Sequence, residues 1–140
     1  MRPRTILMFE GLMLGTLVVG WLQLALSWTR QVPNLARITQ HPITMLLAMM
    51  TVMTAIYLAL TLLVSRRRSR IAAGVLIVLF AFGIPAFVRT ITAGSPTGYT
   101  VLADIQIVGQ FVALILLFLP SARAWFRRDD AKPDLRETFS

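Results

Sequence analysis

Long apolar runs alternate with short polar segments along the 140 residues of this chain. Four runs of about 20 residues are long enough for an α-helix to cross the ~30 Å hydrocarbon core of a bilayer, and they cover residues 6–28, 43–64, 71–88 and 101–119. We expect helices because an isolated strand cannot satisfy its backbone groups in lipid, and the runs lack the alternation of an outer-membrane barrel. The pattern therefore predicts an all-α fold, a bundle of four transmembrane helices.

The composition agrees with a membrane location and narrows the chemistry. Hydrophobic residues make up 56% of the chain and charged residues 14%, whereas soluble domains carry about 25% charged residues. The absence of cysteine and the single histidine exclude disulfides, thiolate catalysis and most metal or haem sites. The runs also lack a recognisable pairing of nucleophile and base. We therefore expect no metal, no cofactor and no enzymatic activity.

The basic residues give a net charge of +8 and are divided unevenly among the polar segments. If the runs are spans, one side of the membrane holds eleven basic residues: two before residue 6, four in the stretch SRRRSR at 65–70 and five after residue 120. The other side holds three, within segments 29–42 and 89–100. By the positive-inside rule, both termini are predicted to be cytoplasmic in a bacterial inner membrane, with SRRRSR as a cytoplasmic hairpin. Nucleic-acid binding is not expected, because lipid occupies the flanks where stacking aromatics would be needed.

The start of the chain also resembles a signal peptide, with MRPR before an apolar run and Ala25-Leu26-Ser27 as a small-residue cleavage site. That apolar run covers 21 residues, from Ile6 to Leu26, and contains Glu10, whereas signal peptides use about 7–15 apolar residues. We therefore expect a retained first span.

The segments around the spans carry predictions of their own. Segment 29–42 is expected to hold a short helix on the membrane surface, Pro85 to kink the third span, and Pro120 to end or bend the fourth. The stretch SARAWFRR that follows is predicted to lie at the membrane interface, and the polar residues 127–140 are predicted to be disordered.

Eight side chains are predicted to contact anionic headgroups or the acidic surface of a partner, and each arginine is expected to contribute about 1 kcal/mol to headgroup binding. They are Arg66, Arg67, Arg68, Arg70, Arg123, Trp125, Arg127 and Arg128.

Small residues at four-residue or similar spacing predict where the helices approach one another closely. The first span offers Gly11 and Gly15. The second and fourth spans offer Thr51, Ala55 and Ala59, and Ala103, Gly109 and Ala113, respectively. Such motifs mark contact faces and carry no functional assignment.

Polar side chains within the spans are candidate functional sites, because such groups are costly in lipid. They are Glu10, Gln23, Arg89, Asp104, Gln106 and Gln110. Glu10 and Asp104 lie near opposite membrane faces, about 15 Å apart along the normal, too far for a paired-carboxylate dyad, which needs less than about 10 Å. We expect both to be ion-paired residues that orient the bundle, Asp104 with Arg89. The alternative is a proton- or cation-binding role for Glu10.

The four candidates other than Glu10 and Gln110 are expected at a similar depth toward the outer face. Hydrogen bonds between helices explain this polar set without a ligand. Gln106 and Gln110 share a helix face at i, i+4, and Gln110 is the expected partner of Tyr57, which lies mid-span and needs one.

Two stretches resemble an uncharacterised group of small bacterial inner-membrane proteins with four helices. The first is the Phe9-Glu10 pair that opens the first span, and the second is a Pro-x-Ala-Arg-x-Trp-Phe close at residues 120–126. This resemblance implies the fold and the location, and no activity. The chain also resembles, more weakly, the small multidrug-resistance transporters, which have four short helices and a membrane glutamate in the first. Glu10 lies nearer its helix end than the glutamate of that family.

These observations favour a non-enzymatic integral inner-membrane protein, an accessory subunit or interaction module of a membrane complex. Its expected partners are anionic lipid, a membrane protein or a second copy of the chain. The alternative is a small proton-coupled transporter that works through Glu10. A lipid-modifying enzyme would regain support only if Arg89, Asp104 and Gln106 converged on a headgroup.

Overall fold

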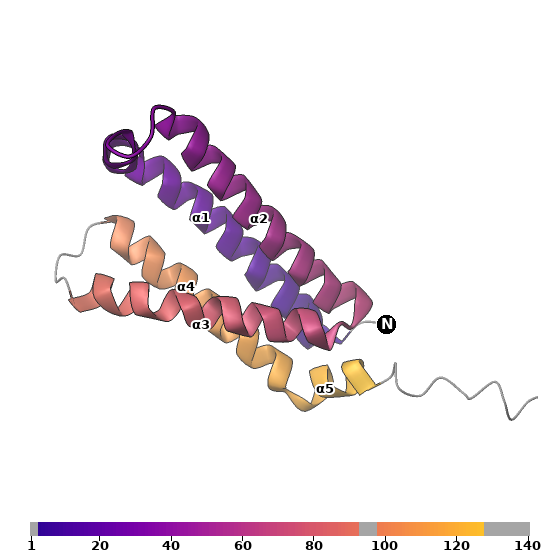
Figure 1. Cartoon of the computed structure of the whole chain (residues 1–140). Helices are drawn as coiled ribbons and strands as arrows, with labels where there is room; N and C mark the ends of the chain where they lie inside the picture. Colours follow the sequence, from indigo (N-terminus) through magenta and orange to yellow (C-terminus); the bar gives the residue numbers. More distant parts are fainter. Residues whose placement is uncertain (1–2, 93–97, 128–140) are drawn as a thin grey trace, which may run out of the picture.

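The computed structural model describes residues 3–92 and 98–127, and the regular structure within them is entirely helical. The helices are α1 (Arg4–Ala36), α2 (Pro42–Arg67), α3 (Arg70–Thr92), α4 (Gly98–Phe118) and α5 (Pro120–Arg127) (Figure 1). The all-α prediction is confirmed. The tail predicted to be disordered, apart from Arg127, and the turn between the last two predicted spans lie largely outside the described residues.

Among the described residues, three helices have the length and composition to cross a membrane: α1, α2 and the Val101–Phe118 part of α4. The apolar stretch Arg70–Pro85 of α3 is shorter. The helix itself continues through Pro85 to Thr92.

The first helix extends further than the sequence predicted. It runs for 33 residues, so the segment expected to hold a separate surface helix forms instead the last two turns of α1 and a short turn. Pro33 lies inside α1 and removes a single backbone donor. The helix ends where the amides of Ile38 and Thr39 both donate to the carbonyl oxygen of Leu35. Pro42 then opens α2, in the first turn where its missing donor costs nothing.

The stretch SRRRSR forms a tight hairpin between α2 and α3. Only Arg68 and Ser69 lie between the two helices. Arg68 adopts a left-handed conformation, with φ of 55°, and the amides of Arg68 and Ser69 both donate to the carbonyl of Leu63. The hydroxyl of Ser69 accepts the amide of Ala72 at 3.2 Å and so caps the start of α3. The hairpin is therefore encoded by local hydrogen bonds.

The most extensive helix contact joins α1 and α4. Buried residues follow α1 at intervals of three and four: Ile6, Phe9, Met13, Thr16, Gly20, Leu24 and Ser27. At the crossing, the methyl carbon Cγ2 of Thr16 lies 2.9 Å from the place where a Cβ on Gly109 would stand. The side-chain nitrogen of Gln106 lies 3.3 Å from the equivalent place on Gly20. Because Gly20 and Gly109 have no side chain, the backbones of α1 and α4 can approach closely.

Two of the predicted contact faces are wrong. A Cβ on Gly11 or Gly15 would meet nothing within 4 Å, and Thr51, Ala55 and Ala59 are exposed. The two glycines lie off the stripe of buried residues on α1, which carries the bulkier apolar side chains that pack against α4. In the fourth span, Gly109 and the buried Ala113 do lie at the contact, as expected.

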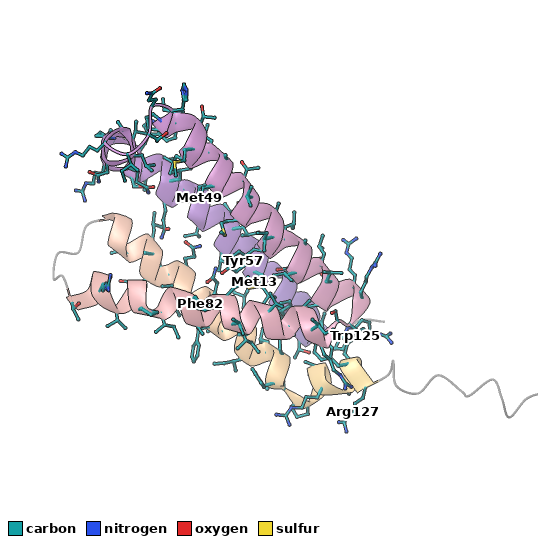
Figure 2. The ribbon with its side chains drawn as sticks, in the orientation of Figure 1. Met13, Met49, Tyr57, Phe82, Trp125 and Arg127 are labelled. Atoms are coloured by element: carbon teal, nitrogen blue, oxygen red, sulfur yellow. The ribbon has the colours of Figure 1, made fainter. Side chains whose placement is uncertain are left out.

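The hydrophobic core lies at one end of the bundle. It combines the first turns of α1, the last turn of α2, the first turns of α3, the last turns of α4 and the buried face of α5. Its largest members include Phe9, Met13, Val64, Leu76, Leu117, Trp125 and Phe126. Figure 2 shows Trp125 and Arg127 at this end. Elsewhere large apolar side chains such as Phe82 are exposed, as expected for helices that face lipid.

Candidate functional site

The three basic segments predicted to share one side of the membrane meet at one end of the molecule, called here the basic end. It comprises the start of α1, the hairpin at 65–70 and α5 (Figure 1). Pro120 starts α5 one residue after α4 ends, which confirms the predicted break. The hydroxyls of Thr5 and Ser121 lie 3.0 Å apart and join α1 to α5.

Arg68 and Trp125 hold the hairpin against α5. The Arg68 guanidinium carbon lies 4.1 Å from the centre of the Trp125 ring, a cation–π contact. Trp125 is 7% exposed, and its indole nitrogen Nε1 is buried without a hydrogen-bond partner. Both residues were predicted to contact lipid or a partner. The structure instead places Trp125 in the core, because α5 turns after α4 and lies against the start of α1.

A concave site lies beside this contact, between the start of α3 and α5. Arg70, Arg123, Phe126 and Arg127 line an open pocket of about 340 Å³. The Arg70 side chain donates from Nη2 to the carbonyl oxygen of Phe126 at 3.3 Å, which ties the two walls together. We call this the arginine pocket.

The arginine pocket arises from the amphipathic pattern of α5. Ala122, Trp125 and Phe126 are buried, whereas Arg123 and Arg127 are exposed one turn apart. Two other predicted contact residues, Arg66 and Arg67, are exposed on the last turn of α2 and do not line the pocket. Arg128 lies outside the described residues.

Glu10 lies on α1, close to the basic end. It is half-buried beside the buried Phe9, and it is not a free carboxylate. It does not line the arginine pocket.

The outer polar set is only partly brought together. Gln106 packs against Gly20, as described above. The amide nitrogen of Gln23 and the Oδ1 oxygen of Asp104 are both buried and make no hydrogen bond. Arg89, the expected ion-pair partner of Asp104, is exposed and leaves that oxygen unpaired. No convergence of Arg89, Asp104 and Gln106 on a common ligand is visible among the described side chains.

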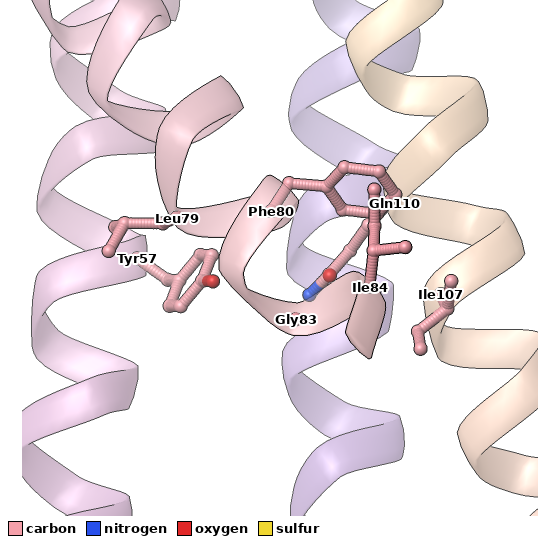
Figure 3. A pocket seen from close by; sticks show the side chains of 7 residues that line it. All are labelled: Tyr57, Leu79, Phe80, Gly83, Ile84, Ile107 and Gln110. Atoms are coloured by element: carbon pink, nitrogen blue, oxygen red, sulfur yellow. The ribbon is translucent and has the colours of Figure 1, made fainter. Parts of the chain in front are cut away.

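Tyr57 and Gln110 face one small cavity between α2, α3 and α4 (Figure 3). Its volume is about 30 Å³, room for about one water molecule. The other lining residues are Leu79, Phe80, Gly83, Ile84 and Ile107. Tyr57 and Gln110 therefore lie on the same cavity, and the hydrogen bond predicted between them stays a prediction. The Phe80 ring also stacks on Phe111 of α4, with ring centres 6.1 Å apart.

Within residues 3–92 and 98–127, no group of three or more His, Asp or Glu side chains could hold a metal ion. No protein-family model, curated protein or solved structure matches the chain. Its function must therefore be argued from its own geometry.

Sequence reasoning missed two parts of this arrangement. The contribution of Thr16 and Gly20 to the crossing was detectable from the spacing of three and four along α1. The arginine pocket was not, because it depends on the direction in which α5 turns after Pro120, and that direction is set by the tertiary burial of Trp125 and Phe126.

Proposed function

We propose that the chain is an integral protein of a bacterial inner membrane, with four spans and both termini in the cytoplasm. Support comes from the three helices with the length and composition of membrane spans. The whole of α3 has 23 residues, about 35 Å of helix, which suffices for the remaining span. The basic end then faces the cytoplasm, in accordance with the positive-inside rule.

In this membrane the protein acts as a non-enzymatic accessory subunit or interaction module. The observation that carries this proposal is the basic end itself. The start of α1, the hairpin and α5 are far apart in sequence, yet hydrogen bonds and the stacking of Arg68 on Trp125 fix them into one surface. A rigid surface of exposed arginines suits anionic lipid or the acidic surface of a membrane-protein partner. The resemblance to small four-helix inner-membrane proteins is part of the same proposal.

Extraction of the tagged protein from its native membrane in polymer nanodiscs, followed by native mass spectrometry, tests the partner. A larger protein at fixed stoichiometry supports the accessory role. A homo-oligomer without any partner contradicts it and favours the rival, proton-coupled transport through Glu10. Glu10→Gln then separates the two, because transport vanishes in the rival, whereas only stability or assembly changes in an accessory subunit.

The natural absence of cysteine allows a clean test of topology. Single cysteines at Arg67 and at Gln40, both exposed and at opposite ends of α2, are treated with a membrane-impermeant maleimide on intact spheroplasts. We expect labelling at position 40 and protection at position 67 until the membrane is opened. The reverse pattern would contradict the proposed orientation.

A further inference from the structure

We propose that the arginine pocket binds the phosphate-bearing headgroup of a single anionic phospholipid, whose acyl chains lie along α3 and α4. This inference rests on the membrane location proposed above and names the ligand of the basic end. It goes beyond a general attraction to lipid, because it assigns one molecule to one site.

The walls of the pocket provide the donors that a phosphate requires. Arg123 and Arg127 are exposed and stand one turn apart on α5, and within the described residues neither side chain makes a hydrogen bond or ion pair. Guanidinium groups bind phosphate oxygens through paired, charge-assisted hydrogen bonds. The contact of Arg70 with the carbonyl of Phe126 fixes the distance between the walls, so the site is formed before the ligand arrives. A volume of about 340 Å³ lies within the range of small-molecule sites, about 300–1,000 Å³.

The surface that leads away from the pocket favours a lipid over a soluble phosphate compound. Immediately beyond Arg70, exposed apolar residues continue along α3 at helical spacing: Ile71, Val75, Val78 and Phe82. The end of α4 that leads into α5 carries a second such stripe: Phe111, Ile115 and Phe118. Ile71 is 81% exposed and Phe118 is 54% exposed. A cationic pocket that continues into apolar stripes matches the division of a phospholipid into headgroup and chains.

Two charge-matched double variants test the site. Arg123→Gln with Arg127→Gln removes two arginines that line the pocket. Arg66→Gln with Arg67→Gln removes two exposed arginines of the basic end that do not line it. Both variants lose the same charge from exposed positions, and circular dichroism checks that both keep the helical content of the original protein.

The measurement is native mass spectrometry of the purified full chain in neutral detergent, titrated with phosphatidylglycerol or, separately, with phosphatidylcholine. The original protein should retain one phosphatidylglycerol in preference to phosphatidylcholine. The Arg123/Arg127 variant should bind phosphatidylglycerol roughly 25-fold more weakly, since each arginine near an anionic headgroup contributes about a factor of five. The Arg66/Arg67 variant should weaken binding by much less than this roughly 25-fold loss, because neither arginine lines the pocket.

Three results would overturn the proposal. Equal weakening in the two variants would mean that charge alone attracts the lipid. Displacement of the lipid by excess inorganic phosphate would assign the pocket to a free phosphate compound, and displacement by an oligoglutamate peptide would assign it to an acidic protein segment. Because the purified chain is used alone, the lipid-binding result does not depend on whether a partner protein is found. A missing partner would contradict the accessory role without affecting the measured lipid binding.

Discussion

The close approach of α1 and α4 gives the sharpest stability prediction. At Gly109 a Cβ would lie 2.9 Å from the Cγ2 carbon of Thr16, closer than nonbonded carbons approach. Gly109→Ala therefore forces the two helices apart or strains the Thr16 side chain, and overpacking of this kind costs about 1–3 kcal/mol. The substitution also gains helix propensity, about 1 kcal/mol in water, so its net effect alone is ambiguous.

Gly15→Ala removes that ambiguity. A Cβ at Gly15 meets nothing within 4 Å, so this control variant gains the same propensity without the clash. The free energy of unfolding of Gly109→Ala should therefore be lower than that of Gly15→Ala by roughly 1–3 kcal/mol. Unfolding by sodium dodecyl sulfate in mixed micelles, followed by circular dichroism, measures the difference.

A second change identifies the clash with Thr16 as the cause. Thr16→Ser removes the Cγ2 methyl and keeps the hydroxyl, which donates to the carbonyl of Met13 at 2.8 Å. Alone, this change should cost about 0.8 kcal/mol for the lost methyl. Added to Gly109→Ala, it should abolish most of the penalty. Equal stability of Gly109→Ala and Gly15→Ala, or a penalty that persists with serine at position 16, would refute the proposed packing.

Substitutions at three further positions probe other features. Gly20→Ala should lower the free energy of unfolding by less than Gly109→Ala does, and by less than about 1 kcal/mol. The Cβ at position 20 would lie 3.3 Å from the side-chain nitrogen of Gln106, which can move away. A larger loss of stability in the same unfolding assay would contradict this. The Arg68→Gly variant should be more stable than the Arg68→Ala variant by about 1 kcal/mol. Both variants lose the contact with Trp125, but glycine adopts the φ of 55° at this position without strain. Equal melting temperatures of the two variants would argue against the left-handed conformation of residue 68. Asp104→Asn should preserve or raise the melting temperature, because it removes a charge whose Oδ1 oxygen is buried without a partner; a marked loss would reveal a role for the carboxylate that this geometry does not explain.

The sequence predicted those features that depend on local pattern. Apolar run length identified α1, α2 and α4, and Pro120 marked the break before α5, because both signals act within one or two helical turns. The outer end of α1 was mispredicted because the apolar run ends at Trp28, whereas the helix continues through polar residues and Pro33 to Ala36. The contact faces predicted at Gly11 and Ala55 were wrong, because small residues at this spacing allow two helices to approach closely but do not require it.

The candidate site was likewise predictable from the sequence only in part. Its arginines were identified from charge alone, and their shared location follows from the antiparallel connection of the helices. The pocket itself depends on two things that sequence pattern does not encode: the direction in which α5 turns after Pro120 and the contact of Arg70 with the carbonyl of Phe126. The core position of Trp125 was missed because a tryptophan among arginines also suits a membrane interface.

The one-sided core has a consequence for motion. Most of the buried apolar contacts of the described residues lie at the basic end, whereas between Leu46 and Thr61 α2 has no buried residue. Local opening costs least where few side chains are buried. Amide hydrogen exchange should therefore be slowest near Met13 and Val64, and it should quicken along α2 toward Pro42, while α1 and α4 stay packed together along their crossing.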